Sequence, residues 1–508
     1  MKRILAALLV LMLVGMLLAS CGGPSPVEDF TFELNEDGAS YTITKYVGEG
    51  GNVSIPPEYN GLPVVGIKDI GSSKIEKLHI PDSVTTLASN FFMCSDSALV
   101  EITVDEGNPA YFSVNNCLVE KESKTLVRGC VNSVIPGDGS IVAIGENAFY
   151  GESSLTEIVF PEGITSIGKY ALANCGELTS ISIPTSLTDF PVNVIGDRNA
   201  GSPKLSFTVY ENCKYLGNGE NLYVVVVKTA DTNLSVANIH QDTKVIAAGA
   251  FSDCESLTTV NFASGIVEIG RGAFSGCTSL ETLNNFPGAV TEISQGCFEE
   301  TNLVNFTVPS QIKVICENAF KNADLEGLCL SEGVQIIEDG AFSYAKLPTG
   351  FTIPNTVVSI GTFCFRGTDF SGATLVIPDS VTSIGRGALT ESYNLGVLTI
   401  GAGITEIPQS FADNSRDLTM VTIGENVKKI CQYAFYNTKL TAVELYSSLK
   451  EVEDKVFSNA LMTFVYNGTV EEFNAITNIK NMINPYGFTT KDHAKVVCTD
   501  GEVLLRKP

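Results

Sequence analysis

Three histidines are the first candidates for acid–base chemistry in this 508-residue sequence, and none stands in a catalytic motif. His79 precedes "IPDSVTTL", His240 precedes "KVIAAGAF", and His493 lies in the C-terminal tail. The chain contains neither an HExxH pair nor a GxSxG nucleophile that such a histidine could serve. We therefore expect structural or surface roles for all three, and a protein that is not an enzyme.

Carboxylates are the second source of possible chemistry. Glu162, Glu268, Glu332 and Glu425 recur at loops or turns, so a solvated acidic edge explains them better than a glycosidase acid and base pair, which needs a cleft. No EF-hand loop occurs, and we expect no metal and no cofactor, with weak Ca²⁺ binding by acidic turns left open as an alternative. With 32 Lys and Arg against 57 Asp and Glu, the net charge is −25. An acidic chain of this kind excludes nucleic acid as a partner.

Cysteines could form disulfides or bind zinc, but their positions argue for packing. Cys175, Cys254 and Cys277 fall three residues after a recurring bulky residue, while Cys297 and Cys364 replace a recurring alanine. Cysteine thus behaves as a small buried residue, and we expect a mostly reduced set. One or two bridges stay open as an alternative, with Cys254 and Cys277 the nearest pair. No paired CxxC motifs suggest zinc.

The N-terminus is typical of an export signal. Lys2 and Arg3 precede an uncharged run over Ile4–Ser20, which predicts a signal peptide at residues 1–20. An uncleaved anchor is the alternative, although 17 residues are at the short limit for crossing the bilayer.

Cys21 is the expected lipidation site. In "LASCGG" small residues precede the cysteine, as in the lipobox at which bacterial lipoproteins are cleaved and acylated. We therefore predict an exported protein that is lipid-anchored to the bacterial membrane and faces the extracellular side. Residues 21–29 form a tether, and acylated Cys21 is the only expected membrane contact.

One sequence motif recurs through the rest of the chain and determines the fold. "IGRGAFSGC", which contains Phe274, returns as "IGENAFYGE", "ICENAFKNA" and "ICQYAFYNT". The bulky position recurs about 14 times at steps of 22 to 24 residues, with two longer gaps. One coil buries too little apolar surface to fold alone, so each copy must stack on the next. The positions are Phe92, Phe149, Leu172, Ile195, Phe251, Phe274, Phe298, Phe320, Phe342, Phe365, Leu389, Phe411, Phe435 and Phe457.

Each coil is expected to contain two short strands and a turn. In "LTSISIP" the spacing turns Leu178, Ile181 and Ile183 inward, and Pro184 ends the strand. "VTSIG" supplies a second strand, and "AF" follows on a turn or a single helical winding. The sequence thus predicts a β-rich repeat solenoid with a parallel concave sheet and short convex turns.

The ends and the two long gaps predict the domain boundaries. Residues 30–71 form an N-terminal cap, residues 72–466 the solenoid, and residues 467–508 a C-terminal cap with a short helix near 470–476 and a final hairpin. Insertions near 108–134 and 207–242 are expected to protrude as β-hairpins.

Two groups of residues are candidate binding sites. The outward residues of the concave strands form a ladder of hydroxyls and amides, for which β-propensity is a simpler explanation than a ligand. Aromatic residues in or beside the insertions are better candidates for protein contacts. The first group contains Thr259, Asn261, Thr282, Asn284, Asn305 and Thr307, beside Ser180, Ser182, Met420, Thr422, Ala442 and Glu444. The second contains Tyr111, Phe112, Tyr210, Tyr215 and Tyr223.

The pattern "IPxxVTxIGxxAFxxCxxLxxIxIP" resembles the BspA-like bacterial surface leucine-rich repeats over roughly residues 64–466. The resemblance implies a right-handed leucine-rich repeat solenoid on a cell surface, in a family that contains adhesins. It carries over no binding residue, because the shared positions are the buried scaffold.

The favoured hypothesis is a non-enzymatic, lipid-anchored surface protein for protein binding or adhesion. Its partner would be a host or neighbouring-cell surface or matrix protein. The alternatives are a carbohydrate-binding surface accessory protein and a structural envelope spacer without a specific ligand.

Overall fold

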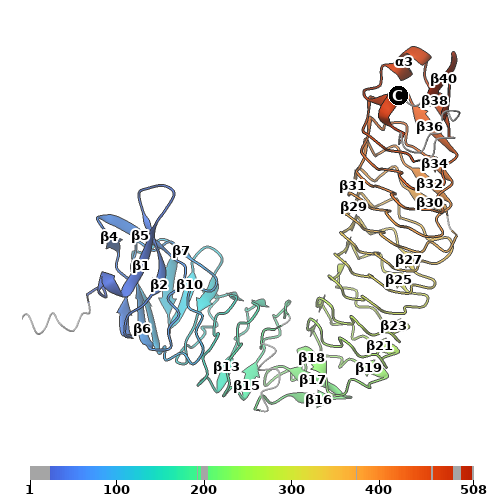
Figure 1. Cartoon of the computed structure of the whole chain (residues 1–508). Coiled ribbons are helices and arrows are strands. Elements are labelled where there is room, and N and C mark those ends of the chain that lie inside the picture. The colour runs from blue at the N-terminus through green and yellow to red at the C-terminus, as the bar shows by residue number, and fades with distance from the viewer. Residues whose placement is uncertain are drawn as a thin grey trace, which may run out of the picture. The chain divides into compact units, whose positions relative to one another are not determined.

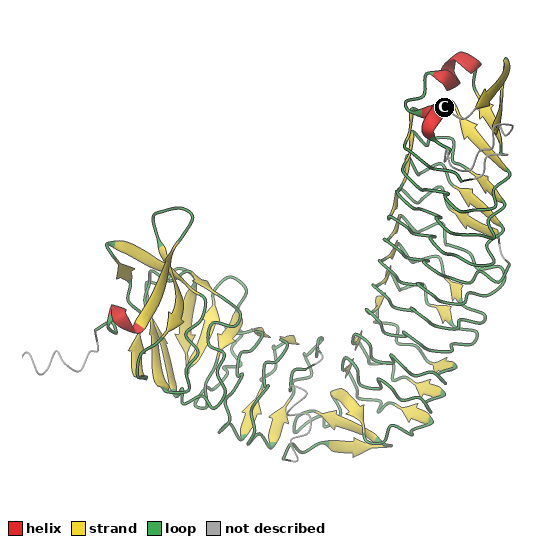
Figure 2. Cartoon of the chain, viewed as in Figure 1, coloured by secondary structure: helices red, strands yellow, loops and turns green. Residues whose placement is uncertain are grey.

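The structure is a computed structural model and describes residues 23–191, 193–195, 204–372, 374–458, 462–483 and 494–505. The signal peptide, Cys21 and His493 lie outside these residues. The described chain forms two compact units. The first runs to Thr208 and also includes Leu216–Val224, and the second comprises Val209–Tyr215 and the chain from Val225 onward. Within each unit parallel β-coils are stacked, with almost no helix (Figure 1 and Figure 2).

The first strand of each coil has the predicted pattern. In β15 (Ser180–Ser182), Ile181 is buried between the exposed Ser180 and half-buried Ser182, and Leu178 and Ile183 are buried beside it. We call these segments the first strands. They are β6 (Ile75–Ile80), β8 (Glu101–Val104), β13 (Glu157–Val159), β15, β19 (Val236–Asn238), β21 (Thr259–Asn261), β23 (Thr282–Asn284), β25 (Thr307–Val308), β27 (Cys329–Leu330), β30 (Thr374–Ile377), β32 (Val397–Ile400), β34 (Met420–Thr422), β36 (Ala442–Tyr446) and β38 (Thr463–Asn467).

The "VTSIG" segment of each coil forms the second strand. These strands are β7 (Thr86–Leu87), β12 (Ala143–Ile144), β14 (Ser166–Ile167), β20 (Val245–Ile246), β22 (Glu268–Ile269), β24 (Glu292–Ile293), β26 (Val314–Ile315), β28 (Ile336–Ile337), β29 (Ser359–Ile360), β31 (Ser383–Ile384), β33 (Glu406–Ile407), β35 (Lys429–Ile430) and β37 (Glu451–Val452). In runs such as β24-β26-β28-β29-β31, each second strand pairs in parallel with the second strand of the next coil. Ile337 faces Ile360 in this register, and both are buried.

The "AF" motif lies on a turn, which we call the AF turn. Around Phe342, Gly340 has φ 63° and Tyr344 has φ 58°, and around Phe365 the same two positions have φ 53° and 62°. The turn therefore needs the left-handed backbone twice per coil, two residues before and two after the bulky residue. Glycine and asparagine adopt it most readily, which explains their recurrence in the motif.

The bulky residues of the second unit stack into a phenylalanine ladder. Their rings lie nearly parallel, with centroids 5.2 to 5.7 Å apart and interplanar angles of 4° to 15°. The coil spacing of about 4.8 Å fixes this separation, so each ring is covered by the next coil's ring. The ladder consists of Phe251, Phe274, Phe298, Phe320, Phe342 and Phe365.

One copy departs from the phase that the sequence indicated. The amide of Leu389 donates to the carbonyl of Phe411, and that of Ala412 donates to Ala434. Phe411 thus takes the alanine position and Ala412 the bulky position. The Phe411 ring meets Phe435 at 89° instead of stacking. The prediction that Phe411 is the bulky residue of its coil is wrong, because both residues are buried and composition alone does not order them.

In several coils the position three residues after the bulky one holds a small buried donor. Cys277 Sγ donates to the carbonyl of Phe251 at 3.0 Å, and Thr368 Oγ1 donates to that of Phe342 at 2.7 Å. Ser415 makes the same contact with Leu389 at 2.7 Å, in phase with Ala412. Cysteine therefore acts here as a hydrogen-bond donor between coils as well as a packing residue.

All cysteines of the described residues are free thiols. Burial raises the pKa of Cys277 to about 12, so this thiol keeps the proton that it donates. The bridge that the sequence left open between Cys254 and Cys277 does not form.

The two insertions have the same strand order and do not protrude. The first starts with the antiparallel strands β9, β10 and β11, the second has β16, β17 and β18 as neighbours in that order, and the last strand of each joins the second strands: β11 pairs in parallel with β12, and β18 with β20. The expectation of protruding hairpins is therefore wrong, because the last strand of each insertion completes a coil. The first insertion contains β9 (Tyr111–Val114), β10 (Cys117–Glu120) and β11 (Thr125–Arg128), and the second contains β16 (Thr208–Tyr210), β17 (Cys213–Leu216) and β18 (Val225–Thr229).

The solenoid has about 18 turns instead of the expected 14 or so, because the insertions and the caps add coils at both ends and in the gaps. The four additional turns come from β5, β11, β18 and the parallel bridge between Glu451 and Thr477. The solenoid prediction itself is confirmed.

A buried ion pair anchors the first insertion. Arg128 of β11 pairs with Glu152 of the following AF turn, and both side chains are almost fully buried. Arg128 also donates to the carbonyl of Tyr150 at 2.9 Å and lies 4.9 Å from the ring centroid of Phe92. Burial raises the pKa of Glu152 even though Arg128 lies beside it.

The caps extend the same sheets. At the N-terminal end β2 pairs in parallel with β5, and β5 pairs in parallel with β7. At the C-terminal end the expected helix is α3, whose capping box joins Thr469 and Glu472, and Phe473 is buried. The cap elements are η2 (Val27–Asp29), β1 (Phe30–Leu34), β2 (Tyr41–Tyr46), β3 (Gly51–Ser54), β4 (Glu58–Tyr59), β5 (Leu62–Ile67), α3 (Val470–Asn474), η3 (Ile479–Asn481), β39 (Ala494–Cys498) and β40 (Gly501–Leu505).

Candidate binding surfaces

The predicted amide ladder exists on β19, β21 and β23, but its side-chain amides are hydrogen-bonded to one another. Asn261 Nδ2 donates to Asn238 Oδ1 at 2.6 Å, and Asn284 Nδ2 donates to Asn261 Oδ1 at 2.8 Å. Asn238 in turn donates to the carboxylate of Glu211 in the second insertion. Because each amide is used by its neighbour, the ladder stabilises the strand register and offers a ligand few free groups.

The remaining candidates of this face are threonines and one turn residue. Thr259 and Thr282 lie opposite each other in the register of β21 and β23, and Thr282 is exposed. Thr307 is exposed in β25. Asn305 is exposed too, but its φ of 56° places it in a turn before β25. Its backbone N–H donates to the backbone carbonyl of Glu326 at 2.7 Å.

The five aromatic candidates of the insertions do not share one accessible surface. Tyr111 and Tyr215 are buried, and their hydroxyls accept hydrogen bonds from the amides of Leu87 and His240, each at 3.2 Å. The buried rings therefore belong to the core. The half-buried remainder comprises Phe112, Tyr210 and Tyr223.

The two described histidines take part in surface pairs. His79 lies between Thr103 Oγ1, at 2.9 Å from Nδ1, and Asp105 Oδ1, at 3.2 Å from Nε2. The hydroxyl, imidazole and carboxylate lie on an exposed sheet surface. His79 is 37% exposed there, so water competes with these groups for each hydrogen bond. The His240 ring packs at 89° against Tyr210.

Carboxylates of the loops hold backbone amides of neighbouring coils. Glu162 accepts hydrogen bonds from the amides of Thr185 at 2.7 Å and Ser186 at 3.1 Å. Partial burial opposes ionisation of Glu162, but these hydrogen bonds outweigh it and lower its pKa. Asp379 accepts in the same way from Ala402 at 2.7 Å. The acidic excess thus has a structural use.

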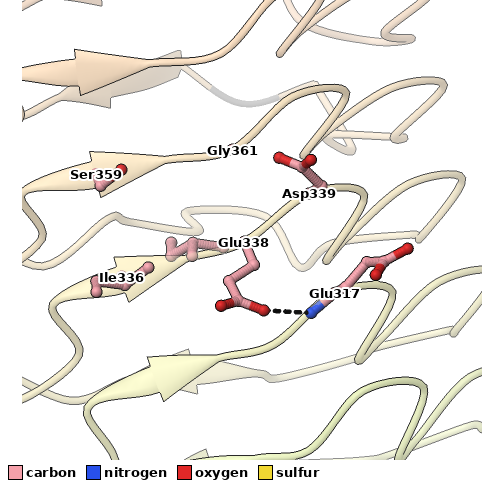
Figure 3. Close-up of a pocket in the computed structure, with 7 residues that line it drawn as sticks. Glu317, Ile336, Glu338, Asp339, Ser359 and Gly361 are labelled. Atoms are coloured by element: carbon pink, nitrogen blue, oxygen red, sulfur yellow. Dashed lines mark hydrogen bonds between the residues drawn. The ribbon is translucent and has the colours of Figure 1, made fainter. Parts of the chain in front are cut away.

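An acidic hollow of about 370 Å³ lies beside the second strands β28 and β29 (Figure 3). Glu338 accepts a hydrogen bond from the amide of Glu317 at 3.0 Å, and Asp339 accepts one from Thr362 at 2.6 Å. These carboxylates again support backbone, with Ile336 exposed beside them. In the described part of the chain, no group of three or more His, Cys, Asp or Glu side chains is placed to hold a metal ion.

A broader surface on the first strands from β30 to β38 was only partly recognised in the sequence. In one outward row Thr374, Val397, Met420, Ala442 and Thr463 stand side by side. The other row contains Val376, Thr399, Thr422, Glu444 and Val465. We call these two rows the β30–β38 face.

The β30–β38 face is apolar for an outward surface. Val376 is 51% exposed, Met420 55% and Val465 46%. Glu444 is the only charged residue of the two rows. The alternation of inward and outward residues in "TLVIP" and "TFVYN" could have identified these outward valines. However, such short apolar segments are also typical of strands that are buried on both faces.

The AF turns of the second unit expose aromatic and arginine side chains that the sequence did not single out. Tyr344 and Phe363 occupy left-handed turn positions that glycine and asparagine most often fill. Their signal in the sequence is this replacement of a small residue by a large one at a fixed repeat position.

Within the residues that have been placed, no helix is long and apolar enough to span a bilayer.

Comparison with known proteins gives a family and a set of solved structures. The family model for the BspA type leucine-rich repeat region matches six copies, at residues 128–217, 229–348 and 335–463, which together make up more than half of the chain. A comparison with curated proteins gives no match.

Among solved structures, a leucine-rich repeat protein from Bacteroides ovatus is 15% identical over 93% of this chain and 99% of its own, with a TM-score of 0.39. A leucine-rich cell surface protein from Faecalibacterium prausnitzii is 20% identical over 90% and 98%, with a TM-score of 0.26.

Proposed function

Because the chain belongs to the BspA-type leucine-rich repeat family, we propose that it is a non-enzymatic surface protein that binds another protein through the β30–β38 face. The leucine-rich repeat solenoid is a scaffold that generally binds ligands rather than catalysing reactions.

The exposed apolar rows of the β30–β38 face are the observation that carries this proposal. In a protein of net charge −25, ten outward residues in register include one charge and three well-exposed apolar side chains. Exposed apolar side chains that recur on alternate strands of one sheet face, with only one charge among them, are typical of protein contact sites. A flat parallel sheet also presents its side chains in fixed rows, so little entropy is lost when a partner docks.

A binding screen with matched variants tests the site. The full chain is measured by surface plasmon resonance against purified matrix proteins and intact host or neighbouring cells. We expect a saturable protein ligand, and an affinity at least tenfold weaker for Met420→Lys combined with Val465→Lys. Ile336→Lys, which changes an exposed apolar residue on β28, is the control and should leave binding unchanged.

Three outcomes would contradict the proposal. Equal loss in the control would mean a general effect of charge. Binding of glycans without any protein ligand would favour a carbohydrate-binding accessory protein. Absence of binding in every assay, together with an envelope defect after deletion of the gene, would favour a structural spacer.

We further propose that acylation of Cys21 anchors the protein to the outside of the bacterial membrane. The "LASCGG" sequence after an uncharged run supports this. Cys21→Ser should abolish incorporation of radiolabelled fatty acid and move the protein from the membrane fraction to the soluble fraction. Continued membrane retention without label would indicate an uncleaved anchor.

A further inference from the structure

Four consecutive AF turns, from Phe342 to Ala412, expose an unusual set of planar side chains. Tyr344 is 44% exposed on the first of these turns, and Tyr393, which is 55% exposed, follows the third turn in a parallel bridge with Asp369. Phe363 and Arg366 lie on the turn between them, both half-buried. We call this surface the aromatic edge.

A hollow of about 410 Å³ lies at one end of the aromatic edge, lined by Glu391, Tyr393, Asn414 and Arg416. The Asn414 amide is held in place, because its Nδ2 donates to Asp413 at 3.0 Å and its Oδ1 accepts from Asn437 at 3.0 Å. Arg416 is exposed and forms no ion pair with any residue that the structure places. The hollow thus offers one aromatic ring, one carboxylate and one unpaired guanidinium, while the Asn414 amide, whose two polar atoms are used by Asp413 and Asn437, forms a fixed wall.

A second hollow of about 290 Å³ adjoins it, with Tyr344, Phe363, Thr362 and Arg366 in its lining. The guanidinium carbon of Arg366 lies 5.6 Å from the ring centroids of both Tyr344 and Phe363. Arg366 Nε also donates to Glu391 Oε2 of the first hollow at 3.2 Å. This contact fixes the two hollows relative to each other.

Aromatic rings beside planar hydrogen-bonding side chains fit the chemistry of a sugar. An aromatic face packs against the apolar C–H face of a pyranose, and carboxylate and guanidinium groups bind its hydroxyls in pairs. Tyr393 pairs through Asp369 with Lys346, two residues after Tyr344, so the coils of Tyr344 and Tyr393 are two coil spacings apart along the solenoid, about 10 Å at about 4.8 Å each. That separation suits rings in two sugar units of one extended oligosaccharide.

The charges of the site favour an uncharged sugar. Glu391 neutralises Arg366, so Arg416 is the one unpaired cation of the first hollow, and Asp413 precedes the lining residue Asn414 in the chain. The net charge of −25 would repel a polyanion. We propose that the aromatic edge is a binding site for a neutral oligosaccharide, distinct from the protein-binding β30–β38 face.

Calorimetric titration of the full chain tests this site. The probes are neutral hexasaccharides of β-1,4-glucose, β-1,4-N-acetylglucosamine, β-1,4-xylose and β-1,4-mannose, with hyaluronan hexasaccharide as the acidic probe. We expect at least one neutral hexasaccharide to bind. Its affinity should fall at least tenfold for Tyr393→Ala and for Arg416→Ala, and stay within threefold for Tyr393→Phe, which keeps the ring.

Two controls separate the site from folding and from the protein face. Tyr170→Ala removes an exposed tyrosine from an AF turn of the first unit, and Met420→Lys alters the β30–β38 face; neither should change sugar binding. Unchanged thermal melts of the variants verify their folding. Absence of neutral binding, binding of hyaluronan alone, or equal affinity of Tyr393→Ala and the unaltered protein would each overturn the proposal.

Discussion

Small hydroxyl and thiol side chains link one coil to the next at the position three residues after the bulky one. Thr368 is fully buried, and its hydroxyl donates to Phe342 of the preceding coil. Cys277 and Ser415 make the same bond in their coils. The position also holds Ala323 and Ala345, so it requires small volume, and where Cys, Ser or Thr occupies it the side chain can add a hydrogen bond between coils.

Replacement of Thr368 by valine tests this interpretation. The shape is kept and the donor is lost, so we expect Thr368→Val to lower the free energy of unfolding by about 1 to 2 kcal/mol. Thr368→Ser keeps the donor and should lose less. Urea unfolding of the three proteins makes the comparison, and a valine variant as stable as the parent would show that only volume matters.

Asp413 should make stability depend on pH. Burial raises its pKa from 3.8 to about 6, opposed by the Asn414 amide and assisted by Glu391. A raised pKa means that the folded state holds the proton more tightly than the unfolded state. The contribution of Asp413 to stability is therefore fully present below pH 3.8 and is lost as the pH rises through 6.

The neutral isostere Asp413→Asn removes this dependence. We expect it to raise the melting temperature at pH 7.5 and to change it little at pH 4, as measured by scanning calorimetry. Equal effects at the two pH values would mean that Asp413 titrates as an ordinary surface carboxylate.

At the scale of elements, the phenylalanine ladder is the continuous core of the second unit. Phe320 stacks between Phe298 at 5.7 Å and Phe342 at 5.3 Å. Its removal opens a cavity that two neighbouring coils line. We expect Phe320→Ala to cost about 3 to 5 kcal/mol in urea unfolding. Phe286→Ala, at a half-buried ring outside the ladder, is the control and should cost less.

The first insertion depends on its buried ion pair. Arg128→Met leaves the Glu152 charge buried without a partner, which should cost about 3 to 5 kcal/mol. Glu152→Gln combined with Arg128→Met removes both charges and should regain most of that loss. A double variant no more stable than Arg128→Met would assign the cost to packing against Phe92.

The sequence predicted the repeating elements better than their exceptions. Leu178, Ile181 and Ile183 were predicted inward because a period of two and a terminal proline leave one arrangement. The phase at Phe411 and Ala412 was missed, since two adjacent apolar residues satisfy the same pattern. The insertions were expected to protrude because sequence cannot tell a strand of a hairpin from a strand that also completes a coil. The aromatic edge was missed because Tyr344 and Phe363 differ from the residues that recur at their positions. An alignment of repeats draws attention to shared residues and not to single substitutions.

At the scale of the whole chain, the excess of acidic residues governs the response to salt. Some carboxylates bind backbone amides, as Glu162 does, but a net charge of −25 still repels itself. We expect the melting temperature to rise by about 2 to 4 °C, equivalent to about 1 kcal/mol, between about 10 and 150 mM NaCl, where the screening length falls to about 8 Å. A fall over this range in scanning calorimetry would mean that local ion pairs outweigh the repulsion.

Stacked coils have a mechanical consequence. A coil of 22 to 24 residues occupies about 4.8 Å along the solenoid, yet the same residues pulled straight span about 80 Å. Since each coil is held by its neighbours alone, tension applied at one end peels coils singly from that end. Under load such a chain should therefore lengthen many-fold in steps of one coil each, while the coils that have not yet been pulled off stay folded.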